Sequence, residues 1–283
     1  MLPAFVFLFL LLLFLYQDTT LYLARIWSEW EGGSYSHGFV VLLLSGYIIY
    51  KKRKVLSLVD TCPALYALPL VALNVVAWSL AGLANIQLLQ AVILLPLVLS
   101  VILLLGGWQV TWKLLLPVLY IGLAIPVWSP LMPLLQTITA ESAFSLTRVA
   151  GIPAFMDDYT INLPAGRLSI EEACSGLHYL LAGVTLGVFY AWQNYRTFRH
   201  RFLVVALAIG APILANILRV FIITWLAHRT AMQHPYIEDH LSLGWYLFAA
   251  LVFLLLVVDL LLGRHADESE TVQPRVKNVQ CKY

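Results

Sequence analysis

Long apolar runs separated by short polar connections constrain this sequence more than any other feature. The chain of 283 residues is 61% hydrophobic and 11% charged, with a mean hydropathy of +0.85. A soluble domain cannot hide that much apolar surface from water, so lipid must cover much of it. None of the runs shows the sustained alternation of a membrane β-barrel strand. The sequence therefore predicts an all-α, multi-pass membrane bundle.

Apolar segments that approach the roughly 20 residues needed to cross a bilayer as a helix define the predicted topology. We expect about eight crossings, at 2–16, 37–50, 64–82, 86–106, 112–127, 174–191, 202–226 and 243–262. The first segment lacks a basic start and a small-residue cleavage site, so it is interpreted as an anchor rather than a signal peptide. The expected domains are one transmembrane domain at 1–263 and a polar tail at 264–283.

Basic residues collect on one side of this topology. Lys51-Lys52-Arg53-Lys54 follows the second segment, and a further basic cluster at 196–201 follows the sixth. Loops rich in Lys and Arg stay in the cytoplasm, so both termini are expected there. The outward loops at about 17–36 and 128–173 are acidic, and the second is expected to hold short interfacial helices. Because the faces carry opposite charge, the net charge of +2 does not indicate nucleic-acid binding.

Cys174 is the only cysteine expected on the outer side, in Glu-Glu-Ala-Cys-Ser-Gly at the start of the sixth segment. It has no outer partner for an intrachain disulfide. Free N–H groups at a helix start favour a thiolate, whereas Glu171 and Glu172 repel one and are expected to cap the helix. The chain has no Cys-x-x-Cys pair and no His-Glu-x-x-His motif, so neither a metal nor an organic cofactor is expected.

Arg219 lies within an apolar run, roughly 10 Å below the outer interface if the run is a helix. A guanidinium at that depth costs at least ~2.5 kcal/mol, which favours a functional role, although an outward-reaching side chain or an internal pair is an alternative. Asn216 stands one turn earlier on the same face and is predicted to orient Arg219 or to bond a neighbouring helix.

His240 precedes the last segment on the outer side, so Cys174, Arg219 and His240 can meet below one outward opening. They would serve as nucleophile, oxyanion stabiliser and proton carrier in acyl transfer. Other histidines on the same side remain alternative bases, and one of them would stand one helical turn below Cys174. These alternatives are His37, His178 and His234.

At these residues the chain resembles the exosortase/archaeosortase family of multi-pass membrane cysteine transpeptidases. The similarity runs through Tyr35-Ser36-His37-Gly38, Glu172-Ala173-Cys174-Ser175-Gly176, Asn216-Ile217-Leu218-Arg219, and His240 with Gly244-Trp245. The resemblance implies Cys174 as nucleophile, Arg219 as the second catalytic residue and His240 as the third. A histidine in the third role points to the bacterial exosortase branch. Asn216, Ser175, Gly176, His37 and His178 are expected to support the site or contact substrate.

The resemblance also implies the partners. The substrates would be exported proteins that end in a short Pro-Glu-Pro-like motif, a transmembrane helix and a basic cluster. The enzyme would lie in the bacterial inner membrane with its site facing the periplasm, in a system linked to exopolysaccharide and biofilm export. The sequence specifies no oligomeric state and no acyl acceptor.

Three other functions compete with this interpretation. A transporter or channel would place Arg219 and the histidines along a solute route. An envelope acyl- or glycosyl-transferase would use His240 or His178 as base, and Cys174 would have no role in it. A scaffold would need none of these groups. Polar residues gather near the outer ends of the later segments, which favours the cysteine enzyme.

Overall fold

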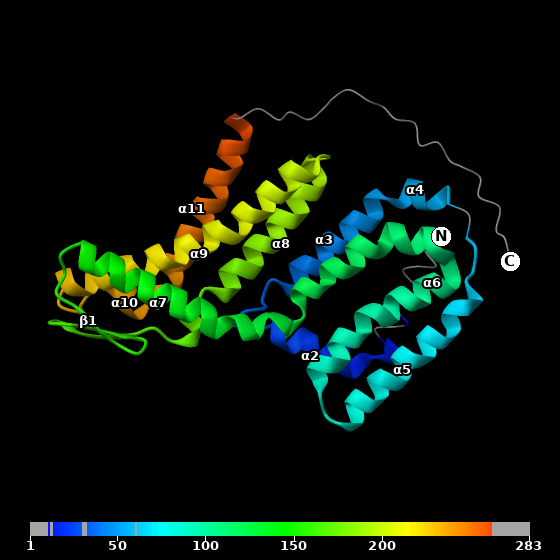
Figure 1. Ribbon diagram of the computed structural model, residues 1–283, viewed down its shortest axis with the longest axis horizontal. Coiled ribbons are helices and arrows are strands. Elements are labelled where there is room, and N and C mark those ends of the chain that lie inside the picture. Colours follow the sequence, from blue (N-terminus) through cyan, green and yellow to red (C-terminus); the bar gives the residue numbers. More distant parts are fainter. Residues whose placement is uncertain (1–10, 12–13, 30–32, 60, 262–283) are drawn as a thin grey trace. The chain divides into compact units, whose positions relative to one another are not determined.

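The structure, a computed structural model, describes residues 11, 14–29, 33–59 and 61–261, without the side chains of 238, 240, 241, 254–256 and 258–261. The chain divides into two compact units between Val127 and Trp128. Helices dominate each unit, which confirms a mostly helical protein (Figure 1). The predicted tail at 264–283 lies outside the described residues, and the single transmembrane domain at 1–263 stays a prediction.

The first unit consists of helices only, as far as the structure describes it. In chain order they are α2 (Gln17–Trp27), α3 (Gly38–Lys51), α4 (Arg53–Ser57), η1 (Leu65–Ala67), α5 (Leu68–Leu83), α6 (Gln87–Tyr120) and η2 (Ile121–Ala124). A further 3₁₀ segment, η3 (Pro126–Leu131), lies where the two units divide.

A sharp bend divides α6 into two parts that run in different directions (Figure 1). Gly107 makes the bend with φ 76° and ψ 179°. A Cβ there would collide with the Cys62 carbonyl oxygen, and a positive φ is strained for any residue with a side chain. The bend falls between the predicted crossings at 86–106 and 112–127.

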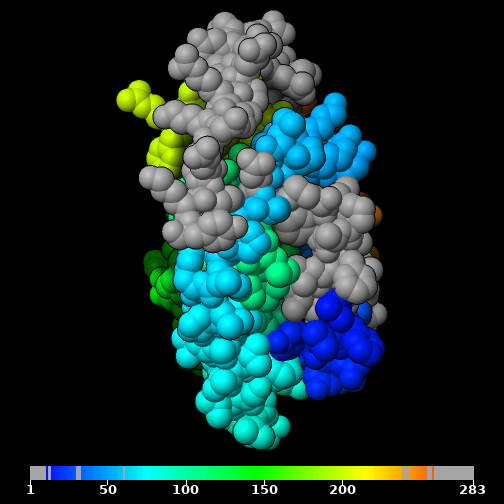
Figure 2. Space-filling model, turned by 90° about the vertical axis from the view of Figure 1, so that its right-hand side faces the viewer, coloured from blue at the N-terminus to red at the C-terminus, as the bar shows by residue number. Residues whose placement is uncertain are grey.

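The outer face of α5 is apolar. Leu73 is 64% exposed and Leu83 81% exposed, and the surface that α5 contributes faces the viewer in cyan in Figure 2. Exposing this much apolar surface to water is unfavourable, so this face is suited to contact with lipid.

The expected outward loop at 17–36 is helical in part, which the sequence analysis missed. Thr19, Leu23 and Trp27 form the buried face of α2, and Trp27 Nε1 donates a 2.8 Å hydrogen bond to the Ala124 carbonyl. A Cβ at Gly38 would overlap the Trp27 ring. The Tyr35–Gly38 motif therefore begins α3 and lets two helices of this unit approach closely.

The second unit combines long helices with a small sheet. Its elements are α7 (Met132–Val149), β1 (Phe155–Asp157), β2 (Thr160–Leu163), β3 (Gly166–Ser169), η4 (Glu172–Cys174), α8 (Leu177–Asn194), α9 (Phe198–Arg229), α10 (Pro235–Glu238) and α11 (His240–Leu261). Helix α8 lies along α9, and α7 and α11 also pack on α9 (Figure 1). Small residues permit the α8–α9 contact, because a Cβ at Gly183 would come within 2.6 Å of Pro212.

The sheet is the main departure from the all-α prediction. Strands β1, β2 and β3 pair antiparallel in that order, with Ile161 opposite both Met156 and Leu168. Ile161 is fully buried in a core shared with residues of α7 and α9. The short alternating strands escaped detection because only this packing buries one of their faces. Helix α7 does occupy the 128–173 loop, where short helices were expected.

Four described segments are long and apolar enough to cross a membrane: Leu65–Leu83, Gln87–Ala124, Glu172–Asn194 and Phe198–Arg229. The apolar helices Gly38–Lys51 and Ser242–Phe253 are shorter. Most of the predicted crossing at 2–16 lies outside the described residues. The count of about eight crossings and the cytoplasmic termini stay predictions.

Candidate thiol site

Cys174 ends η4, the short turn that connects β3 to α8. Its N–H donates a 2.8 Å hydrogen bond to the Glu171 carbonyl, and its thiol is free and partly exposed. Gly176 then adopts a left-handed conformation with φ 84°, and α8 begins at Leu177. The expectation that Cys174 starts the helix is therefore corrected, and His178 does not stand one turn below it in a common helix.

Two buried side chains from other helices hold the main chain around Cys174. Asn216 on α9 donates through Nδ2 to the Cys174 carbonyl at 2.9 Å and to Thr139 Oγ1 at 3.0 Å. Thr139 on α7 in turn donates to the Ser175 carbonyl at 3.4 Å. The Ser175 hydroxyl accepts a 3.4 Å hydrogen bond from the Leu177 N–H. The turn that carries the thiol is thus fixed by α7 and α9 together.

Gly176 is required at this turn for two reasons. Its positive φ is unfavourable for residues with a Cβ. A Cβ built there would also lie 2.6 Å from Cγ and Nδ2 of Asn216. The glycine therefore permits both the turn and the close approach of Asn216.

Arg219 is buried three residues after Asn216 on α9, with 1% of its surface exposed. None of its guanidinium nitrogens has a hydrogen-bond acceptor among the described residues. The Asn216 side-chain oxygen also lacks a donor in that part of the chain. The predicted orienting bond between the two side chains is therefore absent from the described residues, and Asn216 holds the Cys174 turn instead.

Tyr179 on α8 is the neighbour that the sequence analysis missed. Its ring centroid lies 5.4 Å from Cζ of Arg219, a distance typical of cation–π contacts. Its hydroxyl lies close enough to the Arg219 guanidinium to interact with it electrostatically. Tyr179 is 3% exposed. Tyr179 is thus a buried aromatic neighbour of the guanidinium.

The candidate bases lie in different places. His240 begins α11, but its side chain is outside the described residues. His178 is half-buried and its ring lies 3.7 Å from that of Tyr179 and 6.4 Å from that of Trp245, centroid to centroid. In the same unit, His234 accepts a 3.2 Å hydrogen bond from the Tyr236 N–H through Nδ1.

His37 belongs to the first unit, where it precedes α3. Its Nε2 lies 3.2 Å from the Leu123 carbonyl. Burial lowers the pKa of His37, although hydrogen bonds to the main chain of Leu123 and Ser34 act in the opposite direction. A neutral His37 that donates from Nε2 fits this position.

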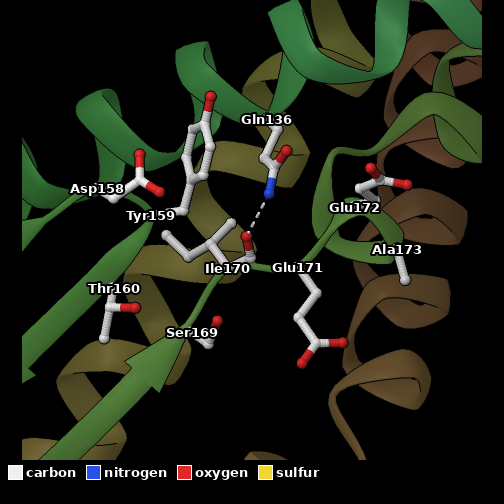
Figure 3. A pocket seen from close by; sticks show the side chains of 9 residues that line it. All are labelled: Gln136, Asp158, Tyr159, Thr160, Ser169, Ile170, Glu171, Glu172 and Ala173. Atoms are coloured by element: carbon white, nitrogen blue, oxygen red, sulfur yellow. Dashed lines mark hydrogen bonds between the residues drawn. The ribbon is translucent and has the colours of Figure 1, made fainter.

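The residues directly before Cys174 in the sequence contribute to the lining of a pocket of about 490 Å³. Residues 158–160, residues 169–173 and Gln136 line it, and Gln136 donates a 2.7 Å hydrogen bond to the Ile170 carbonyl at its wall (Figure 3). Asp158, Glu171 and Glu172 make the lining acidic. Neither glutamate caps α8, whose N-cap is Gly176, so the capping expectation is wrong.

No group of three or more metal-ligating side chains occurs within the described ranges. Gln136 and Thr139 lie three residues apart on one face of α7, but that helix carries several other polar residues, so no specific signal for Thr139 is present in the sequence. Tyr179 gave no specific signal either, since aromatic residues are common throughout this chain.

The fold and the site define a helical membrane protein with a partly exposed thiol on a turn that is held by Asn216 of α9, the helix that also carries the buried Arg219. The family model of transmembrane exosortases matches residues 27–257. The chain belongs to the transmembrane exosortase family, which supports a general role as a membrane sorting transpeptidase that acts on proteins with sorting signals. No curated protein and no solved structure matches the chain.

Proposed function

We propose that this exosortase is a membrane-embedded cysteine transpeptidase that cleaves the C-terminal sorting signals of exported proteins. The substrate would carry a Pro-Glu-Pro-like motif, then a transmembrane helix, then a basic cluster. The enzyme would lie in the bacterial inner membrane with Cys174 facing the periplasm. Its physiological setting would be exopolysaccharide and biofilm export. The membrane location is supported by the family and by the apolar helices.

Cys174 is the nucleophile in this proposal. Its sulfur attacks the carbonyl carbon of the scissile peptide bond, a C–S bond forms, and the carbonyl oxygen becomes an oxyanion. The C–N bond then breaks, and the proton taken from the thiol goes to the departing amine. This leaves a thioester on Cys174. Water or an amine attacks the thioester, and the sulfur leaves with its proton restored.

Arg219 stabilises the oxyanion. A guanidinium presents several N–H donors in one plane, and those of Arg219 have no acceptor among the described residues. In a site from which water is excluded, a preorganised charged donor lowers the barrier strongly because no reorganisation is needed when charge develops.

His240 carries the proton, with His178 as the alternative. The assignment of His240 rests on the family resemblance and on its position at the start of α11. His178 is the alternative because it lies in the first turn of α8, two residues after Gly176 and four residues after Cys174 in the sequence. Single His240→Gln and His178→Gln variants separate the two, since loss of the true base lowers turnover and loss of the other does not.

The substrate tail fits the topology proposed here. Its basic end would stay in the cytoplasm with the basic loops, its helix would lie in lipid against the enzyme, and its motif would emerge near Cys174. Cleavage would release the exported domain from its membrane anchor. Residues 169–173, which directly precede Cys174 in the sequence, line the acidic pocket where the motif would bind.

One observation carries this proposal: the Cys174 turn is held by Asn216, which is three residues from the buried Arg219 on the same helix. A buried main-chain carbonyl needs a donor in any fold, but here the donor lies on the helix that also carries Arg219. This common helix supports a shared role for the thiol and the guanidinium.

The test uses intact cells that co-express the full-length enzyme and an exported protein with the tripartite tail. We expect Cys174→Ala and Cys174→Ser to stop processing and to leave the uncleaved substrate in the membrane. With wild-type enzyme, mass spectrometry of trapped intermediates should find the substrate peptide joined to Cys174 as a thioester. Processing at the wild-type level by both variants would overturn the proposal and favour a transferase or transporter.

A further inference from the structure

Arg219 is a buried cation that makes no hydrogen bond with the residues the structure describes. Its side chain is 1% exposed and all of its nitrogens lack acceptors in that part of the chain. A buried charge normally requires a compensating partner. The Tyr179 hydroxyl approaches the guanidinium, but no Arg219 nitrogen meets hydrogen-bond geometry with it. The face of the Tyr179 ring adds stabilisation of its own, with its centroid 5.4 Å from Cζ.

We infer that Tyr179 is a positioning residue for Arg219, and that it acts through the face of its ring. This inference rests on the proposed function, in which Arg219 serves the chemistry at Cys174. A carboxylate partner would neutralise the guanidinium and occupy its N–H groups. An aromatic face attracts the cation and leaves those N–H groups available to an anion at the thiol.

The ring itself is held in place by aromatic neighbours. Trp245 and Phe248 on α11 each lie 5.8 Å from the Tyr179 ring, centroid to centroid. Tyr179 is 3% exposed, so its ring has little freedom to turn. An immobile ring fixes the guanidinium more tightly than a long side chain alone would.

Gly244 on α11 completes the contact. A Cβ added there would overlap the Tyr179 hydroxyl, approach its ring carbon Cζ to 2.6 Å and approach Cδ of Arg219 to 3.1 Å. The main chain of α11 at Gly244 therefore packs closely against both Tyr179 and Arg219. This gives Gly244 a specific role, because any larger residue would force Tyr179 and Arg219 to separate.

The first measurement compares two alkylating reagents on the full-length protein in lipid nanodiscs, without any sorting substrate. Iodoacetate is an anion and iodoacetamide is neutral, so the ratio of their rates at Cys174 reports a cation near the thiol. Mass spectrometry of the Cys174 peptide separates this residue from the other cysteines. Arg219→Met gives the ratio expected when the cation is lost.

We expect Tyr179→Phe to keep the rate ratio within twofold of wild type, because Phe retains the ring face. Tyr179→Leu and Gly244→Ala should lower it at least fivefold, toward the value of Arg219→Met. Tyr190→Leu, at the other end of α8, is the matched control and should leave the ratio unchanged. A wild-type ratio in Tyr179→Leu, or an equal loss in Tyr179→Phe, would overturn the inference.

A second measurement avoids variants that disturb folding. Phenylalanine with one, two or three ring fluorines at position 179 keeps the shape of the side chain and weakens the negative face stepwise. The rate ratio, and the turnover of a tripartite-tail substrate, should fall progressively along this series while KM changes little. A flat series would refute the role of the ring.

The two proposals fail separately in these experiments. Alkylation needs no catalysis, so a flat fluorine series together with processing that requires Cys174 would refute only the role of Tyr179. A falling alkylation series together with processing that does not require Cys174 would refute only the proposed function.

Discussion

Asn216 donates a 2.9 Å hydrogen bond to the main-chain carbonyl of Cys174, although the two residues lie 42 positions apart in the chain. The same amide bonds Thr139 Oγ1 on α7. Both Asn216 and Thr139 are at least 98% buried. The turn that carries the thiol is therefore held in place by α7 and α9.

Replacement of Asn216 by Ala should weaken this arrangement. The Cys174 carbonyl and Thr139 hydroxyl would lose a buried partner, which costs ~1–3 kcal/mol. We expect a corresponding loss of unfolding free energy in SDS titrations of the purified protein, and slower substrate processing. Asn194→Ala, at the exposed end of α8, should change neither quantity. Unchanged stability in Asn216→Ala would show that the bond contributes nothing.

The left-handed turn at Gly176 should not accept a side chain. Gly176→Ala places a Cβ at φ 84°, which costs roughly 1–2 kcal/mol, and pushes it against Asn216. We expect lower stability and little processing. The effect of Gly176→Ala should be smaller when Asn216→Ala is already present, because the two side chains compete for one space.

Gly210→Ala provides the control for this substitution. Gly210 lies on α9 with nothing within 4 Å of an added Cβ, and Ala is the better helix former. This variant should be as stable as wild type or more so. If Gly176→Ala behaved in the same way, the conformational requirement at Gly176 would be disproved.

Arg219→Lys should not preserve activity, although it keeps a positive charge. Lysine lacks the planar set of donors, and loss of one preorganised oxyanion donor lowers turnover by roughly 10²–10³-fold. The measurement is the initial rate of tail cleavage in membranes. Arg229→Lys, at the exposed end of the same helix, should retain full rate. A rate for Arg219→Lys near wild type would argue that only charge matters at this position.

His37 should make stability depend on pH. Burial lowers its pKa below the ordinary 6.5, so the unfolded chain binds a proton more readily than the folded one. The stabilising contribution is full above the unfolded pKa of about 6.5 and is lost as pH falls through the lower folded pKa. Thermal unfolding of the purified protein between pH 7.5 and pH 5 should show this loss.

His37→Gln should flatten that pH dependence, because glutamine does not titrate in this range. His200→Gln, at an exposed position, is the control and should keep the wild-type slope. An equal slope in wild type and His37→Gln would assign the pH dependence to other groups.

Sequence reasoning succeeded where the signal was local. The apolar runs identified helices such as α5 and α9 because hydropathy depends only on neighbouring residues. It failed for β1, β2 and β3, whose short strands become stable only when Ile161 is buried beneath helices. For Asn216 it was right in part: the expected alternative of a bond to a neighbouring helix is met by Thr139 on α7, whereas the bond to the Cys174 carbonyl was not predicted.

By itself, the sequence determined that this chain is a helical membrane protein and that its polar groups gather near Cys174 and Arg219. Polar groups are costly in lipid, so the few that occur within apolar segments stand out in the sequence. Only the tertiary structure decided which of these groups meet. Asn216 contacts the Cys174 turn, and Tyr179 contacts Arg219. Such contacts depend on how α7, α8, α9 and α11 pack, and the spacing of residues along the chain does not reveal the distances between helices.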